Sequence, residues 1–202
     1  MWKFTIAPAL AVACLLCAAP SAHGLDEADL IAVLTADDAS LEEITTACRE
    51  LQRVGTDEAA PVLAEMLTDE RLSHPARTAL EAIPGDAASE ALRAALGDAE
   101  GAVLAGIVAS IGARKDEDAV EDLAALLEHD DADVASAAAR ALGSIATDEA
   151  AEALKAALED GPDAIRPAVR EGLFRVAEAH LARGDHDEAT EIYQLLWDTA
   201  SN

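Results

Sequence analysis

The chain has 202 residues and carries 14 Lys and Arg against 40 Asp and Glu, a formal net charge of −26. This acidic excess excludes nucleic acid as a natural partner, because the phosphate backbone would be repelled. Hydrophobic residues make up 51% of the chain, too many for a disordered acidic sequence. Alanine fills 50 positions and aromatic residues only 2%. A core with so few large side chains must bring its backbones close together, which favours packed helices.

Residues 1–24 have the pattern of a secretory signal peptide. A short positive start is followed by an uncharged run, Phe4–Ala19, and small residues Ala22 and Gly24 stand at −3 and −1 to a cleavage site before Leu25. We therefore expect residues 1–24 to be removed and the rest to be secreted or delivered to a bacterial periplasm.

Two other readings of this segment are weaker. A membrane anchor would need roughly 20 apolar residues, and this run is shorter and broken by Pro8, so no stable membrane insertion is expected after cleavage. Lipidation at Cys14 is conceivable, but the three residues before it lack the usual leucine. Cleavage leaves Cys48 as the only cysteine, and its helical spacing from Ile44 favours a buried thiol over a reactive one.

Paired leucines recur along the rest of the chain and predict a repeated helix. The i, i+4 pairs begin at Leu63, Leu92, Leu123 and Leu154, with successive starts 29, 31 and 31 residues apart. Between them runs a second series, in which an apolar residue precedes a helix breaker: Val54-Gly55, Ile83-Pro84, Ile111-Gly112 and Leu142-Gly143. Two interleaved series predict helix–turn–helix units that bury their apolar faces by stacking on one another.

The turns carry residues typical of helix ends. The first helix of each unit is predicted to end at a glycine, which tolerates the left-handed cap conformation: Gly55, Gly85, Gly112 and Gly143. The second helices are predicted to begin near aspartates that can accept free backbone N–H groups: Asp57, Asp86, Asp118 and Asp148. A further helix over 25–36 precedes the array, and Ser40 or Asp38 is predicted to cap the next helix.

The segment 133–154 closely resembles a HEAT repeat of the subtype named after phycobilisome lyases, and 163–173 looks like the start of another. The resemblance covers roughly residues 40–175. It implies an all-α fold, an α-α superhelix or right-handed solenoid of HEAT-like hairpins, similar to ARM repeats, with about eleven helices over residues 25–202.

The last segment, 171–200, departs from this pattern. Gly184–Ala189 followed by Tyr193 is similar to the turn and second helix of a tetratricopeptide unit. Phe174, Tyr193 and Trp197 are all in this stretch. Tyr193 matches a packing position of that family, which favours a terminal cap, whereas Trp197 suits a cap and a docking patch equally.

The sequence contains no catalytic constellation that we recognise, and we expect no enzyme, cofactor or metal. A Gly-rich phosphate loop, a Gly-x-Ser-x-Gly motif and a His-x-x-x-His pair are all missing from the residues after 24. Deoxyhypusine hydroxylases, which resemble this array in fold, bind iron through His-Glu dipeptides, and no histidine here precedes a glutamate: His74, His129, His180 and His186. The acidic clusters at 130–133 and 185–188 lack the order of a calcium loop.

The remaining candidate is a surface. In a HEAT-like stack the second helix of each unit lines the concave side, and its outward stripe is mostly acidic. The predicted partner-binding residues are Glu90, Arg93, Glu121, Glu128, Glu152, Lys155 and Glu159, with Trp197 added from the last helix. These residues predict a non-enzymatic exported scaffold that binds a protein or peptide with a basic patch. Two alternatives stay open: an accessory subunit of a chromophore lyase-like complex, and acidity that reflects adaptation to high salt.

The export hypothesis makes a prediction about mass. We expect protein isolated from its native source to begin near Leu25, because the small residues before it fit the cleavage rule. Intact-mass measurement checks this, and a chain that retains Met1 or carries a lipid on Cys14 would contradict it.

Overall fold

The computed structural model describes residues 25–200, so the predicted signal peptide, including Cys14, lies outside the described residues. Over the described range the chain forms eleven α-helices and four short 3-10 helices. None of these helices is long and apolar enough to cross a membrane. The prediction of an all-α solenoid of about eleven helices is confirmed.

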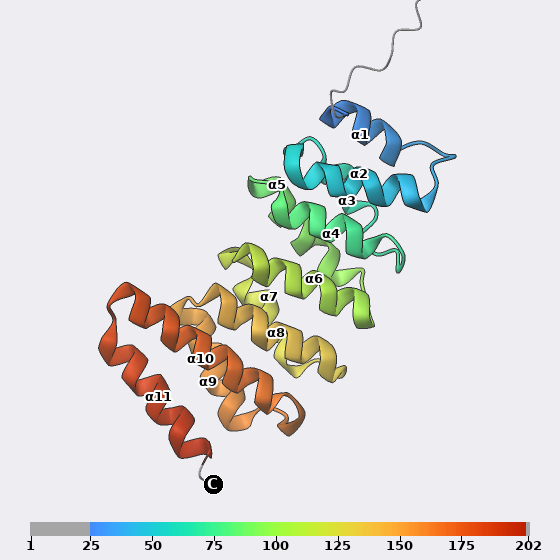
Figure 1. Ribbon diagram of the computed structural model, residues 1–202. Helices are drawn as coiled ribbons and strands as arrows, with labels where there is room; N and C mark the ends of the chain where they lie inside the picture. The colour runs from blue at the N-terminus through green and yellow to red at the C-terminus, as the bar shows by residue number, and fades with distance from the viewer. Residues whose placement is uncertain (1–24, 201–202) are drawn as a thin grey trace, which may run out of the picture.

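The helices lie in two layers. We call the layer built from the first helix of each unit the first-helix layer: α2 (Leu41–Val54), α4 (Ser73–Ala82), α6 (Gly101–Arg114), α8 (Ala132–Ile145) and α10 (Arg166–Arg183). The second-helix layer contains α1 (Glu27–Leu34), α3 (Ala60–Ala64), α5 (Asp86–Ala94), α7 (Val120–Ala125), α9 (Asp148–Asp160) and α11 (His186–Ala200). Figure 1 shows the five helices of the first-helix layer side by side in chain order, each against the next.

Short 3-10 helices join some of these elements. η1 (Ala95–Gly97) and η3 (Leu126–Glu128) extend α5 and α7, while η2 (Glu117–Ala119) and η4 (Asp163–Ile165) precede α7 and α10. The second helices of the middle units are therefore shorter and less regular than the first helices.

The predicted leucine pairs form the core between the layers. Leu63, Leu92, Leu123 and Leu154 are all 0% exposed, and a single apolar cluster runs from α1 to α11. Because each unit buries its leucines against both neighbours, the stack is held together by this continuous core.

The helix starts follow the capping expectation only in part. Ser40 caps α2 as predicted: its Oγ accepts from the Glu43 backbone N–H at 3.3 Å, and the Glu43 carboxylate accepts from the Ser40 N–H at 2.8 Å. The expected aspartate caps are wrong. Thr147, one residue before Asp148, caps α9 through its Oγ1, which accepts from Ala150 N at 3.2 Å. No side chain caps α3, α5 or α7, so Asp57, Asp86 and Asp118 do not act as caps.

Two of the glycines predicted to end helices lie inside them. Gly112 and Gly143 belong to α6 and α8, which continue until Lys115 and Ala146 adopt left-handed φ values of 56° and 57°. A Cβ on Gly112 would lie 2.7 Å from the Cα of Ala141, and one on Gly143 would overlap the backbone of Gly172. These glycines are therefore needed for close helix packing between units. In the sequence, a glycine that allows close packing looks the same as a glycine that ends a helix.

The last two described helices, α10 and α11, pack against each other. Phe174 of α10 and Tyr193 of α11 pack edge to face, with ring centroids 5.6 Å apart. Arg170 donates to the Leu196 carbonyl at 3.0 Å and to Thr199 Oγ1 at 3.0 Å. Tyr193 therefore packs between the last two described helices.

Substitution of Gly143 tests the close packing. Gly143→Ala should lower the free energy of unfolding by about 1–3 kcal/mol, because the added methyl group meets the backbone of α10 and forces the two helices apart. The control is Gly97→Ala, since a Cβ there has no atom within 4 Å, and its effect should stay within about 0.5 kcal/mol. Urea denaturation measures both, and equal midpoints would contradict this role for Gly143.

Cys48 is a buried core residue of α2, as predicted, and burial raises the pKa of its thiol to about 11. At pH 8 the folded protein therefore holds almost no thiolate, and alkylation should be at least about 100-fold slower than in the urea-unfolded chain. Mass spectrometry after timed iodoacetamide treatment checks this. Comparable rates in the folded and unfolded chains would show that the thiol is accessible.

Because the pKa of the Cys48 thiol is raised in the folded protein, the free energy of unfolding should fall as the pH rises above about 9.

Candidate functional site

Charge is divided unequally between the two layers. The α-helices of the first-helix layer carry seven acidic and nine basic residues, whereas those of the second-helix layer carry fifteen acidic and two basic residues. Among the α-helices, the excess of acidic over basic residues therefore lies in the second-helix layer, and the first-helix layer is close to neutral.

Several arginines of the first-helix layer bind backbone carbonyls at helix ends. Arg114 donates to the carbonyls of Leu80 and Ile83 at 2.6 Å each, which closes the last turn of α4. Arg183 similarly reaches the Ala146 carbonyl after α8 at 3.2 Å. Helix ends leave carbonyls without partners, and a guanidinium can satisfy several at once. These cations thus connect successive units and do not neutralise the acids of the second-helix layer.

The two cations of the second-helix layer are also engaged. Arg93 of α5 forms an ion pair with Asp116, which lies in the turn after α6. It also lies 3.8 Å from Asp118. Lys155 of α9 donates to Glu152 at 3.0 Å and lies 4.0 Å from Glu191 of α11. Both were candidate partner-binding residues, and the structure gives each an ion pair that links neighbouring elements.

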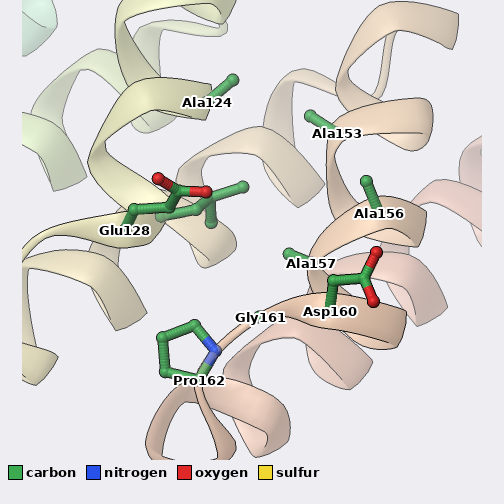
Figure 2. A pocket seen from close by; sticks show the side chains of 9 residues that line it. Ala124, Glu128, Ala153, Ala156, Ala157, Asp160, Gly161 and Pro162 are labelled. Atoms are coloured by element: carbon green, nitrogen blue, oxygen red, sulfur yellow. The ribbon is translucent and has the colours of Figure 1, made fainter.

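A hollow lies between α7 and α9 (Figure 2). Its floor is apolar and made mainly of alanines, and Glu128 and Asp160 stand on opposite sides. The turn at the end of α9 closes it through Pro162. The full lining is Ala124, Leu127, Glu128, Ala153, Ala156, Ala157, Asp160, Gly161 and Pro162. Alanine side chains end at Cβ, so two facing helices built from them leave a furrow that larger side chains would fill.

A second hollow continues along the same two helices toward their N-terminal ends. It shares Ala124 with the first, and its lining is strongly acidic: Glu117, Asp118, Val120, Glu121, Ala124, Thr147 and Glu149. We call the two hollows together the α7–α9 groove. One end of the α7–α9 groove is apolar with two carboxylates at the rim, and the other end has four carboxylates.

The predicted stripe enters the α7–α9 groove only in part. Glu121 and Glu128 line it, whereas Glu90, Glu152 and Glu159 are exposed acids of the second-helix layer that do not. Trp197 is 74% exposed on α11 and does not line it either. Groove residues absent from the predicted set include Glu117, Asp160, Pro162 and the alanines of the floor. Glu117, Asp160 and Pro162 lie at helix ends or in a turn, where the helical period that defined the stripe does not apply, whereas the alanines lie within α7 and α9.

The two acidic clusters considered for a metal have structural contacts. Asp131 accepts from the Asp133 N–H at 2.9 Å and caps α8, and Asp185 accepts from Arg183 Nε at 3.2 Å. In residues 25–200 no three His, Cys, Asp or Glu side chains are grouped in a way that could hold a metal ion.

The comparisons with known proteins concern the middle of the chain and its overall shape. Residues 89–173 match the family model of HEAT repeats. Human deoxyhypusine hydroxylase in complex with glycerol is 18% identical, over 75% of this chain and 74% of that chain, with a TM-score of 0.47. Two engineered proteins are each 23% identical to this chain, with a TM-score of 0.48. The match to the first covers 86% of this chain and 95% of that protein. The match to the second covers 87% of this chain and 58% of that protein. No curated protein matches. The family match spans the stretch from α5 into α10.

Proposed function

We propose that this chain is an exported, non-enzymatic scaffold that binds a protein or peptide with a basic surface through its second-helix layer. The observation that carries the proposal is the unequal division of charge, with fifteen acidic and two basic residues on the α-helices of this layer. A solenoid presents such a layer as one extended surface, so acids from successive units act together on the same partner.

The acids of this surface are available for a partner. Glu90, Glu121, Glu128 and Glu159 are exposed and make no hydrogen bond or ion pair with other described residues through their carboxylates. The two nearby cations are held by other acids, as Arg93 is by Asp116. A concentrated field of one sign steers an oppositely charged partner and speeds its association, and salt screens the effect.

Charge reversal on the two layers tests the proposal. The double variant Glu121→Lys, Glu128→Lys should slow association of a lysine-rich peptide by about tenfold at low salt, because it replaces two carboxylates of the acidic surface by cations. Stopped-flow fluorescence with a labelled peptide at about 0.05 and 0.3 M NaCl measures the rate and its salt dependence, which should flatten in the variant.

The matched control is Glu42→Lys, Glu178→Lys. Both residues are exposed acids of the first-helix layer without an ion pair among the described residues, and the change in net charge is identical. Two other acids of the first-helix layer, Glu81 and Glu171, are unsuitable as controls because each has a partner. Glu81 accepts from the buried Ser110 hydroxyl at 2.6 Å, and Glu171 accepts from Arg175 at 2.8 Å.

The outcomes separate three explanations. A loss confined to the Glu121, Glu128 variant supports a binding surface on the second-helix layer. Equal losses in both variants would show that overall charge attracts the peptide without a defined surface. No loss in either variant would contradict the proposal. It would favour the interpretation that the acidity is an adaptation to high salt or keeps the protein in solution.

A further inference from the structure

We propose that the α7–α9 groove seats one basic amphipathic helix of the partner in a single orientation. The apolar turns of this helix would lie at the end near Pro162, and its lysines or arginines would lie at the end near Glu117. This inference rests on the proposed function, and it adds the secondary structure, the side-chain pattern and the direction of the bound segment.

The apolar end of the α7–α9 groove sets the first requirement. Its floor consists of Ala124, Leu127, Ala153, Ala156 and Ala157, and none of these side chains can pair with a charge. A furrow between two helices accepts the side-chain ridge of a third helix, which is the usual way in which an amphipathic helix binds a helical surface. Large apolar side chains of the partner would fill the space that the alanines leave.

The acidic end sets the second requirement. Glu117, Glu121 and Glu149 line it and make no ion pair within the described chain, and only Asp118 has a cation nearby, Arg93 at 3.8 Å. Lysine or arginine side chains of the bound helix would meet three carboxylates that have no internal partner. The two ends are connected at Ala124, so one continuous helix can satisfy both.

The dimensions of the α7–α9 groove fit a short helix. From Glu117 to Glu128 the lining segment contains η2, α7 and η3. At the rise of helical structure this segment spans roughly 16–20 Å, about three to four turns of a bound helix. A segment of this length can place one apolar patch and one basic patch on the same face.

Helix dipoles select the direction. The C-terminal ends of η3 and α9 both lie at the apolar end, and the N-terminal end of α9 lies at the acidic end. A helix antiparallel to α9 brings its positive N-terminus to these C-terminal ends. Its own basic residues then lie in its last turns, where they also complement its dipole. The partner segment should therefore be apolar in its N-terminal half and basic in its C-terminal half.

The test fills the apolar end without changing charge. Ala156 is exposed and lines the α7–α9 groove, so Ala156→Trp blocks the furrow while leaving the core intact. Ala125→Trp is the matched control, because Ala125 is exposed on α7 and does not line the α7–α9 groove. The probes are two synthetic helical peptides of about 14 residues, four turns, with the same composition. One has leucines first and lysines last, and the other has the reversed sequence.

Fluorescence anisotropy at about 0.1 M NaCl measures the affinities. We expect the leucine-first peptide to bind the unmodified protein at least threefold more tightly than the reversed peptide. Ala156→Trp should weaken its binding by about tenfold, as loss of a central contact does, and Ala125→Trp by less than twofold. Thermal denaturation of both variants checks folding, and Ala156→Leu provides a smaller filling side chain if the tryptophan destabilises α9.

Other outcomes would overturn the inference in distinguishable ways. Unchanged binding by Ala156→Trp, together with a loss in the Glu121→Lys, Glu128→Lys variant, would reject the α7–α9 groove but keep the acidic surface as the binding site. Equal affinities for the two peptides would reject the orientation. Failure of the unmodified protein to bind either peptide would reject both the inference and the proposed function.

Discussion

Backbone contact between successive first helices is the constraint on which the rest of the structure depends. Gly112 lies against Ala141, and Gly143 lies against Gly172, so α6, α8 and α10 approach more closely than a Cβ at either glycine would allow. Such an approach buries apolar area through many small contacts, which is how a chain with few aromatic residues forms a continuous core. The Phe174–Tyr193 pair is correspondingly confined to the last two helices, where no further unit follows in the described chain.

The same packing determines where the charges lie. The last carbonyls of each helix have no hydrogen-bond partner within that helix. Arg114 and Arg183 donate to some of these carbonyls across the interface between units. Most of the few cations lie on the helices of the first-helix layer, and Arg93 and Lys155 connect elements in the second. The acids of the second-helix layer have little internal compensation. The charge asymmetry is thus linked to how the solenoid is held together.

The sequence predicts the helices and the core well because both depend on period alone. Leu123 and Leu154, which start two of the leucine pairs, are 0% exposed as expected. Gly112 and Gly143 were misinterpreted, because one residue type serves both helix termination and close approach, and only the neighbouring helix distinguishes the two. Of the predicted acidic stripe, Glu121 and Glu128 line the α7–α9 groove. Asp160 and Pro162 were missed because they lie at a helix end and in a turn, outside the helical period.

The irregularity of the second helices explains why a groove exists between α7 and α9. α9 is a continuous helix of 13 residues, whereas α7 has 6 and is flanked by the 3-10 helices η2 and η3. A 3-10 helix is more tightly wound than an α-helix, so its side chains stand on a narrower cylinder and reach less far toward a neighbour. With alanines on the facing surface of α9, no side chain of residues 25–199 fills the space that results. A regular α-helix with leucines at these positions would close the furrow, and the acids around it would then border a flat surface without an apolar seat.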